Sequence, residues 1–174
     1  MGFALAGSIP APGTTGKPFA WRVFLSEYMS ANNHPYGNKQ TQFDMRYLRM
    51  AQIWSQNSYC KRKQVGALIV KEKMIISDGF NGTPVGFENN CEDENFETKT
   101  YVLHAEANAI TKVAKSNNSS DGATLYVTTS PCIECAKLII QSGIKRVVFI
   151  ERYRNTEGLE LLERANIEIV QIDV

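Results

Sequence analysis

The side chains most able to do chemistry in this chain lie in two short clusters, a His-Ala-Glu tripeptide and a later Pro-Cys-Ile-Glu-Cys pentapeptide. One imidazole and two thiols are ligands that zinc prefers, and a hydrolytic zinc site keeps three protein ligands and an open position for water. A structural zinc site instead closes its tetrahedron with four protein ligands. We therefore predict a Zn²⁺ site formed by His104, Cys132 and Cys135, with Glu106 as an uncoordinated catalytic carboxylate.

Both clusters are predicted to open a helix. Residues 101–115 carry an apolar pattern that suits a buried helix, with His104 and Glu106 in its first turn. Ser130 followed by Pro131 is typical of an N-cap and a first helical position, so the two cysteines would open a second helix. The partial positive charge at two helix N-termini favours both thiolates and the anionic form of Glu106.

Each half of this pattern has an ordinary explanation when it stands alone. A C-x-x-C pair is more often a structural zinc or redox site, and a single histidine near an apolar stretch is more often a core residue. A closed structural site would need a fourth ligand, and no other His or Cys is adjacent to either cluster. The combination therefore favours a catalytic site.

The remaining patterns predict an α/β domain. Strand-like runs alternate with helices in the second half, which predicts parallel β-α-β crossovers. The charged tripeptide 71–73 predicts a hairpin turn, and Thr41-x-x-Asp44 resembles a capping box for a helix over 45–54. The predicted strands are 65–70, 74–79, 124–129, 147–150 and 167–172, and the later helices start near 104, 132 and 157.

The beginning of the chain differs in composition from the rest. Residues 1–20 are rich in Gly, Pro, Ala and Thr, which predicts a flexible tail. A helical extension is predicted over 21–43, with a helix at 21–31 and a loop at 34–37. The catalytic domain is predicted over 44–174.

Length, charge and cysteine content narrow the class of protein. The 174 residues, 43% of them hydrophobic, suffice for one compact domain. A formal charge of +1 gives no strong field for a polyanion, so no nucleic acid polymer is expected as a partner. Four cysteines without disulfide-like spacing predict a reducing, cytoplasmic location, and neither a membrane span nor a secretory signal is expected.

Longer strings add a resemblance to a known family. The spacing H-x-E followed by P-C-x-x-C is the signature of zinc-dependent nucleobase deaminases. Over 44–174 the chain resembles the deoxycytidylate deaminase family more closely. The strings that carry this resemblance are Val-Gly-Ala (65–67), Gly-Phe-Asn-Gly-Thr-Pro (79–84), His-Ala-Glu-Ala-Asn-Ala-Ile (104–110), Gly-Ala-Thr-Leu-Tyr-Val-Thr (122–128), Pro-Cys-x-x-Cys-Ala-Lys (131–137) and Gly-Ile-Lys (143–145).

The resemblance implies a fold, a reaction and a mode of control. The fold is the cytidine-deaminase-like three-layer α/β/α sandwich with a five-stranded mixed sheet. The reaction converts dCMP and water to dUMP and ammonia, which supplies dUMP for thymidylate synthesis, with Glu106 moving protons at the cytosine ring. A homohexamer is also implied, activated by dCTP together with Mg²⁺ and inhibited by dTTP.

The resemblance also assigns substrate contacts. Asn81 matches an asparagine that contacts the nucleoside, and the backbone at Ala105 and Ser130 would align the base. Arg62 is the candidate cation for the phosphate, and Tyr153 is a second candidate contact. The alternatives are an Asn-Gly turn, a solvated charge cluster and a tyrosine that only packs.

The segment 79–86 resembles the effector loop of the family. The segment begins at Gly79; Gly82 and Gly86 would let the backbone approach a triphosphate closely, while Asn81 links that loop to the active site. A tight turn would explain the same residues.

Cys60 and Cys91 lie outside the metal pattern. Some bacteriophage members of the family resemble this chain around these cysteines and use them with extra histidines for a second, structural zinc. Only His34 remains as a spare histidine, and it lies outside the matching region. We therefore expect two buried free thiols.

Two other functions remain open. A polynucleotide deaminase, such as a tRNA adenosine deaminase, shares both metal motifs, but the neutral charge balance and the strings around Asn81 and Asn108 disfavour it. A non-catalytic module stabilised by zinc would not require the free carboxylate of Glu106.

Overall fold

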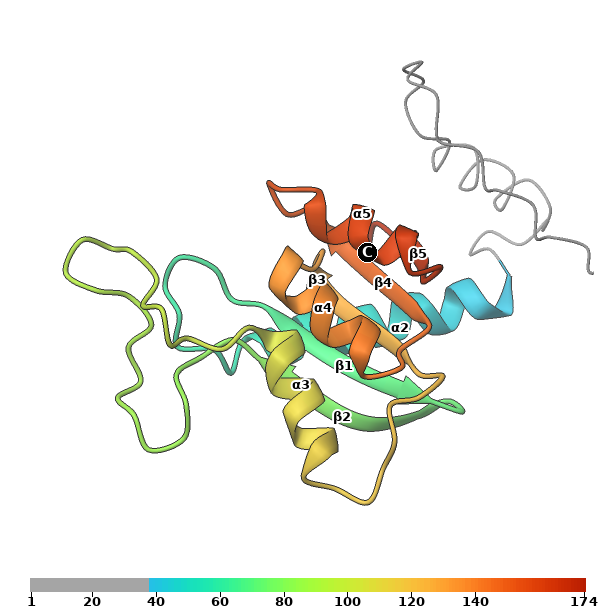
Figure 1. Ribbon diagram of the computed structural model, residues 1–174, viewed down its shortest axis with the longest axis horizontal. Helices are drawn as coiled ribbons and strands as arrows, with labels where there is room; N and C mark the ends of the chain where they lie inside the picture. Colours follow the sequence, from blue (N-terminus) through green and yellow to red (C-terminus); the bar gives the residue numbers. More distant parts are fainter. Residues whose placement is uncertain (1–37) are drawn as a thin grey trace, which may run out of the picture. The chain divides into compact units, whose positions relative to one another are not determined.

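The structure, a computed structural model, describes residues 38–174 and contains a five-stranded sheet in the order β2-β1-β3-β4-β5 (Figure 1). Strand β1 is antiparallel to both β2 and β3, whereas β3, β4 and β5 are parallel to one another. The predicted mixed sheet and its parallel crossovers are therefore confirmed. The strands are β1 (Gly66–Lys71), β2 (Met74–Phe80), β3 (Thr124–Thr129), β4 (Arg146–Glu151) and β5 (Glu168–Gln171).

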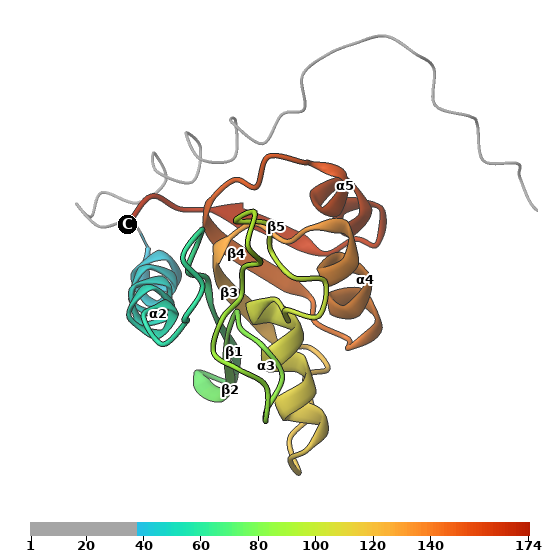
Figure 2. The same ribbon diagram turned by 90° about the vertical axis from the view of Figure 1, so that its left-hand side faces the viewer.

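Helices cover both faces of the sheet, as Figure 2 shows. One face carries α2 (Lys39–Ser55), and the other carries α3 (Ala105–Ala114), α4 (Ile133–Gln141) and α5 (Glu157–Arg164). Side chains alternate along a strand, so Leu68 of β1 packs toward α2 while its neighbour Ile69 packs toward the other helices. Two hydrophobic layers result, and the predicted α/β/α sandwich is confirmed.

The turn between β1 and β2 has a local cause. Its two central residues, Glu72 and Lys73, have φ angles of 51° and 64°. Positive φ at both positions is the geometry of a type I′ turn, whose twist matches that of paired strands. The predicted hairpin is confirmed.

The predicted capping box at the start of α2 is wrong. The helix begins at Lys39, so Thr41 and Asp44 lie inside it, and both are buried. Asp44 accepts two hydrogen bonds from Arg146, at 2.9 and 2.8 Å, and one from the Tyr126 hydroxyl at 2.7 Å. A paired, hydrogen-bonded charge of this kind can stay buried, so Asp44 anchors α2 to β3 and β4 instead of capping the helix.

The helices and strands do not test the predictions for the first 37 residues or for the cellular location. The tail at 1–20, the helix at 21–31 and the loop at 34–37 lie outside the described residues. Within 38–174 no helix combines the length and the apolar character that crossing a bilayer requires. The cytoplasmic location stays a prediction.

Candidate metal centre and adjoining pocket

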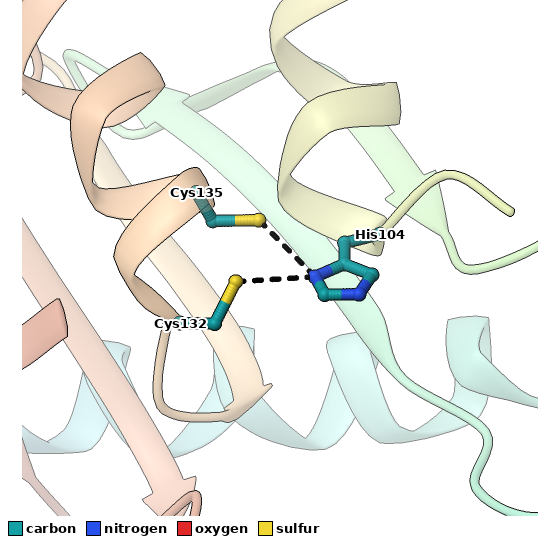
Figure 3. A group of neighbouring side chains, drawn as sticks. All are labelled: His104, Cys132 and Cys135. Atoms are coloured by element: carbon teal, nitrogen blue, oxygen red, sulfur yellow. Dashed lines mark hydrogen bonds between the residues drawn. The ribbon is translucent and has the colours of Figure 1, made fainter. Parts of the chain in front are cut away.

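His104, Cys132 and Cys135 converge on one point between α3 and α4 (Figure 3). The Nδ1 atom of His104 lies 3.4 Å from the sulfur atom of each cysteine. Tetrahedral zinc with bonds of about 2.0 Å to nitrogen and 2.3 Å to sulfur would place its N and S ligands about 3.5 Å apart. The donor types and their spacing therefore fit zinc, as the sequence predicted.

Each ligand lies at the start of a helix. His104 and Cys132 are the N-cap residues of α3 and α4, and Cys135 follows in the first turn of α4. The prediction that Ser130 is the N-cap is wrong, because α4 begins at Ile133 and the Ser130 hydroxyl instead accepts a 2.7 Å hydrogen bond from the backbone N–H of Tyr153.

Two glycines allow close packing around these helix starts. A Cβ at Gly79 of β2 would lie 2.1 Å from the carbonyl oxygen of Ala105 in α3, and a Cβ at Gly158 of α5 would lie 2.2 Å from that of Pro131. Real Cβ atoms do not approach so closely. Because glycine has no Cβ, β2 and α5 can pack closely against the segments that carry the metal ligands.

The two thiols are electrostatically different. The hydrogen bond with Cys135 lowers the pKa of Cys132 to about 3, and the contact with His104 lowers it further. The same contact with Cys132, together with burial, raises the pKa of Cys135 far above its ordinary value. These hydrogen bonds favour the thiolate at Cys132, whereas Cys135 needs a neighbouring cation to become a thiolate.

Glu106 is the second residue of α3 and is only 4% exposed. Burial raises the pKa of its carboxyl, while its backbone hydrogen bond and the charge of His104 act in the opposite direction. The backbone hydrogen bond at the helix terminus acts in the predicted direction, toward the anion, but desolvation outweighs it and the net pKa is raised. A raised pKa suits a group that must both accept and release a proton.

A pocket of about 520 Å³ adjoins the centre. Its size lies within the range of small-molecule sites. It brings together the predicted residues Glu106, Ala105, Ser130, Asn81, Arg62 and Tyr153 with two of the metal ligands. The other lining residues include Cys60, Lys63, Glu92, Glu97, Thr98, Thr129 and Arg154.

Asn81 has a structural task at the pocket wall. Its side-chain oxygen accepts a 2.8 Å hydrogen bond from the backbone N–H of Val65, and its amino group donates one of 2.8 Å to the carbonyl of Lys63. These hydrogen bonds hold the segment that directly precedes β1. Gly82 pairs with Leu103 as an isolated bridge, so the alternative of a simple Asn-Gly hairpin turn is wrong.

The basic residues that line the pocket differ in their interactions with neighbouring side chains. Arg62 is exposed, and its guanidinium makes a long 3.4 Å contact between Nη1 and the Thr98 hydroxyl. Lys63 pairs with Glu151 at 2.7 Å, so its charge is already partly compensated. Of the basic run 61–63, Arg62 is the better placed to meet an anion.

The predicted effector glycines have different surroundings. Gly79 is explained by its packing against α3. Gly86 has a φ of 91°, a backbone conformation that favours glycine. A Cβ placed there would have no atom within 4 Å, so steric crowding does not require glycine at this position. A Cβ at Gly82 would meet nothing nearer than 4.0 Å. The effector role stays a prediction.

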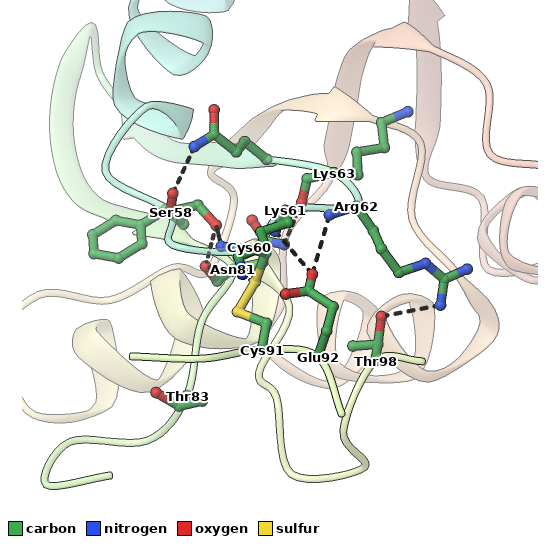
Figure 4. Close-up of a disulfide and its surroundings, with 12 residues drawn as sticks. Ser58, Cys60, Lys61, Arg62, Lys63, Asn81, Thr83, Cys91, Glu92 and Thr98 are labelled. Carbon is green, nitrogen blue, oxygen red and sulfur yellow. Dashed lines mark hydrogen bonds between the residues drawn. A yellow bond between two sulfur atoms is a disulfide. The ribbon is translucent and has the colours of Figure 1, made fainter. Parts of the chain in front are cut away.

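The prediction of free thiols at Cys60 and Cys91 is wrong, although both residues are buried as expected. They form a disulfide across a sequence separation of 31 residues (Figure 4). Residues brought together by a long loop cannot be paired from spacing alone. The disulfide also removes the cysteine argument for a reducing compartment.

Sequence reasoning missed several pocket residues, among them Glu92 and Thr129. Thr129 could have been found, because alternation along β3 places it on the same face as Val127 and Leu125, toward α3 and α4. Glu92 lies in a loop and meets Lys61, about 30 residues away, so no local pattern marks it.

Residues 41–151 match the family model of the cytidine and deoxycytidylate deaminase zinc-binding region. The deoxycytidylate deaminase of enterobacteria phage T4 is 36% identical over 168 residues, covering 72% of this chain and 87% of its own. The ComE operon protein 2 of Bacillus subtilis (strain 168) is 37% identical over 133 residues, covering 74% and 70%.

A solved structure agrees with these matches. The crystal structure of dCMP deaminase from the cyanophage S-TIM5 in complex with dCMP and dUMP superposes with a TM-score of 0.74 and 44% sequence identity. The superposition covers 75% of this chain and 97% of that chain.

Proposed function

The chain belongs to the cytidine and deoxycytidylate deaminase family, and on that basis we propose that it converts dCMP and water to dUMP and ammonia. One observation carries the proposal: a zinc-type ligand cluster, a buried carboxyl and exposed cations share one pocket. A mononucleotide deaminase needs a hydrolytic centre for the base and positive charge for a 5′-phosphate. The pocket combines both.

His104, Cys132 and Cys135 are the proposed zinc ligands. Zinc, when bound, lowers the pKa of water and so supplies the nucleophile for C4 of cytosine. Glu106 takes one proton from that water as its oxygen bonds to C4 and delivers this proton to N3. It then takes the proton of the new C4 hydroxyl and passes it to the amino group, so that the C4–N bond breaks and ammonia leaves. Its raised pKa lets the carboxyl hold the proton between these transfers.

The other pocket residues bind and orient the nucleotide. The backbone at Ala105 and Ser130 aligns the base, and Asn81, which keeps one amino hydrogen free of the backbone bonds named above, contacts the nucleoside. Arg62 binds the phosphate, with Tyr153 as the neighbouring contact. The exposed guanidinium of Arg62 supports this assignment, because its side-chain partner within residues 38–174 is a hydroxyl at the long distance of 3.4 Å.

Ammonia release measured side by side from dCMP, deoxycytidine, dCTP and tRNA tests the proposal. The purified, zinc-loaded chain should act on dCMP, with deoxycytidine a poor substrate because it lacks the phosphate. Equal turnover of deoxycytidine would disprove the phosphate site. Activity on tRNA alone would assign the chain to the polynucleotide class instead.

Regulation is the finer part of the proposal. We propose a homohexamer in which dCTP with Mg²⁺ favours the state that binds dCMP and dTTP disfavours it. The family resemblance of 79–86 supports this, as does the exposed, glycine-requiring turn at Gly86. Initial rates against dCMP should be sigmoidal and become hyperbolic with dCTP. Hyperbolic curves that neither triphosphate changes, from an active preparation, would disprove the regulation.

A further inference from the structure

Two buried side-chain atoms among residues 38–174 have no hydrogen-bond partner, and both belong to residues that line the pocket. They are Oε2 of Glu92 and Oγ1 of Thr129, on residues that are 4% and 5% exposed. Buried polar atoms in native proteins are nearly always paired, so an exception requires an explanation. Their common position on a pocket wall supplies one, because a bound ligand can complete both pairs.

Glu92 is held firmly in place. Its other oxygen, Oε1, accepts hydrogen bonds of 2.9 and 3.1 Å from the backbone N–H groups of Lys61 and Arg62 (Figure 4). The preceding residue, Cys91, is bonded to Cys60, and Glu92 itself forms a bridge with Thr98. The hydrogen bonds hold the carboxyl group, and the disulfide and the bridge hold the backbone on either side of it. The remaining oxygen, Oε2, therefore has a defined position.

The carboxyl group of Glu92 can form a hydrogen bond with only some groups of the nucleotide. An ionised carboxyl only accepts hydrogen bonds, so its ligand must donate one. The phosphate donates nothing near neutral pH and would be repelled, while the amino group of cytosine must lie at Glu106, where it leaves. The 3′-hydroxyl of the deoxyribose is the donor of dCMP that remains.

We infer that Glu92 determines specificity by accepting a hydrogen bond from the 3′-hydroxyl of the nucleotide sugar. This inference rests on the proposed function. It agrees with the order of groups along the pocket, because Glu92 holds the backbone of Arg62, the proposed phosphate contact. The sugar site then adjoins the phosphate site, as the covalent structure of a 5′-nucleotide demands.

The test compares dCMP with 2′,3′-dideoxycytidine 5′-monophosphate, which lacks only the 3′-hydroxyl. The zinc-loaded wild type should prefer dCMP in kcat/KM by about 10- to 150-fold, the range of a hydrogen bond to a charged group. In Glu92→Gln the amide oxygen can still accept from the N–H groups of Lys61 and Arg62, which leaves an NH2 group in the place of Oε2. Because this group cannot accept a hydrogen bond from the 3′-hydroxyl, the preference should fall several-fold. In Glu92→Ala it should approach unity.

The ratio between the two nucleotides separates recognition from a structural effect. A substitution that only loosens the backbone of Arg62 lowers both activities equally and leaves the preference intact, and this result in both variants would overturn the inference. Dissociation constants for dUMP and its 3′-deoxy analogue provide a second measurement, without turnover, and should show the same loss of preference.

A matched control is available two residues away. Glu94 is exposed and lies outside the pocket, so Glu94→Gln makes the same charge change without touching it and should keep the wild-type preference. A wild type that releases no ammonia from dCMP disproves the proposed function and the inference together. Activity on dCMP with no preference for the 3′-hydroxyl disproves the inference alone.

Discussion

Gly79→Ala should damage the metal centre although Gly79 binds neither metal nor substrate. The new methyl group would lie 2.1 Å from the carbonyl oxygen of Ala105 and 2.7 Å from the backbone nitrogen of Ala109, whereas ordinary contacts begin at 3.4 Å. Strand β2 and helix α3 must therefore separate by about 1.3 Å, since both contacts are with backbone that cannot rotate away.

This displacement affects both stability and turnover. Forcing a methyl group into a packed interface costs about 1–3 kcal/mol of the free energy of unfolding. His104 caps helix α3 and Glu106 lies in its first turn, so movement of the helix shifts the proposed metal ligand and the proposed proton shuttle together. A misplacement of about 1 Å can lower a rate by roughly 10²-fold, and we expect a loss of that order in kcat for dCMP.

Gly82→Ala is the matched control, because the nearest atom to its new methyl group would be a ring carbon of Phe80 at 4.0 Å. It should change stability by less than about 0.5 kcal/mol and leave turnover without effectors near wild type. Urea unfolding, zinc content and ammonia release decide the matter. Gly79→Ala with normal stability and normal turnover, but without a response to dCTP, would refute the packing argument and favour a purely regulatory glycine.

Three further substitutions test the site. Glu106→Gln should retain zinc by elemental analysis yet lose about 10²–10⁴-fold in turnover; near-normal turnover would remove Glu106 from the mechanism. Arg62→Ala should raise KM for dCMP by about 10- to 150-fold at unchanged zinc content, and an unchanged KM would place the phosphate elsewhere. Replacing Cys60 and Cys91 together by alanine should cost about 3–4 kcal/mol, because their bond closes a loop of 31 residues; an unfolding free energy equal to that of the oxidised wild type would exclude the disulfide.

The elements and the metal ligands could be predicted because their signals are local. His104 and Glu106 fall within one helical turn, as do Cys132 and Cys135, and the hydrophobic alternation of each strand is visible over a few residues. The helix caps were harder to predict from the sequence. The Thr-x-x-Asp pattern at the start of α2 resembles a cap, but Asp44 is used by a partner about 100 residues away.

The pocket wall opposite the metal could not be predicted for the same reason. Asn81 reaches back to Val65, Cys91 to Cys60 and Glu92 to Lys61, so this wall is assembled from loops that are distant in sequence. Each loop alone has the composition of an ordinary turn or charge cluster. Only the pairing between the loops shows which side chains face the pocket and which one lacks a partner.

The two halves of the pocket are therefore held by different forces, and this difference has a functional consequence. Close helix packing at Gly79 and Gly158 positions the metal ligands, so the chemistry depends on the stability of the sandwich itself. The Cys60–Cys91 disulfide and the carboxyl of Glu92 hold the loops that carry Arg62 and Asn81, the proposed nucleotide contacts. Loosening the loops should therefore raise KM before it lowers kcat, whereas loosening the sandwich should lower kcat and zinc content together.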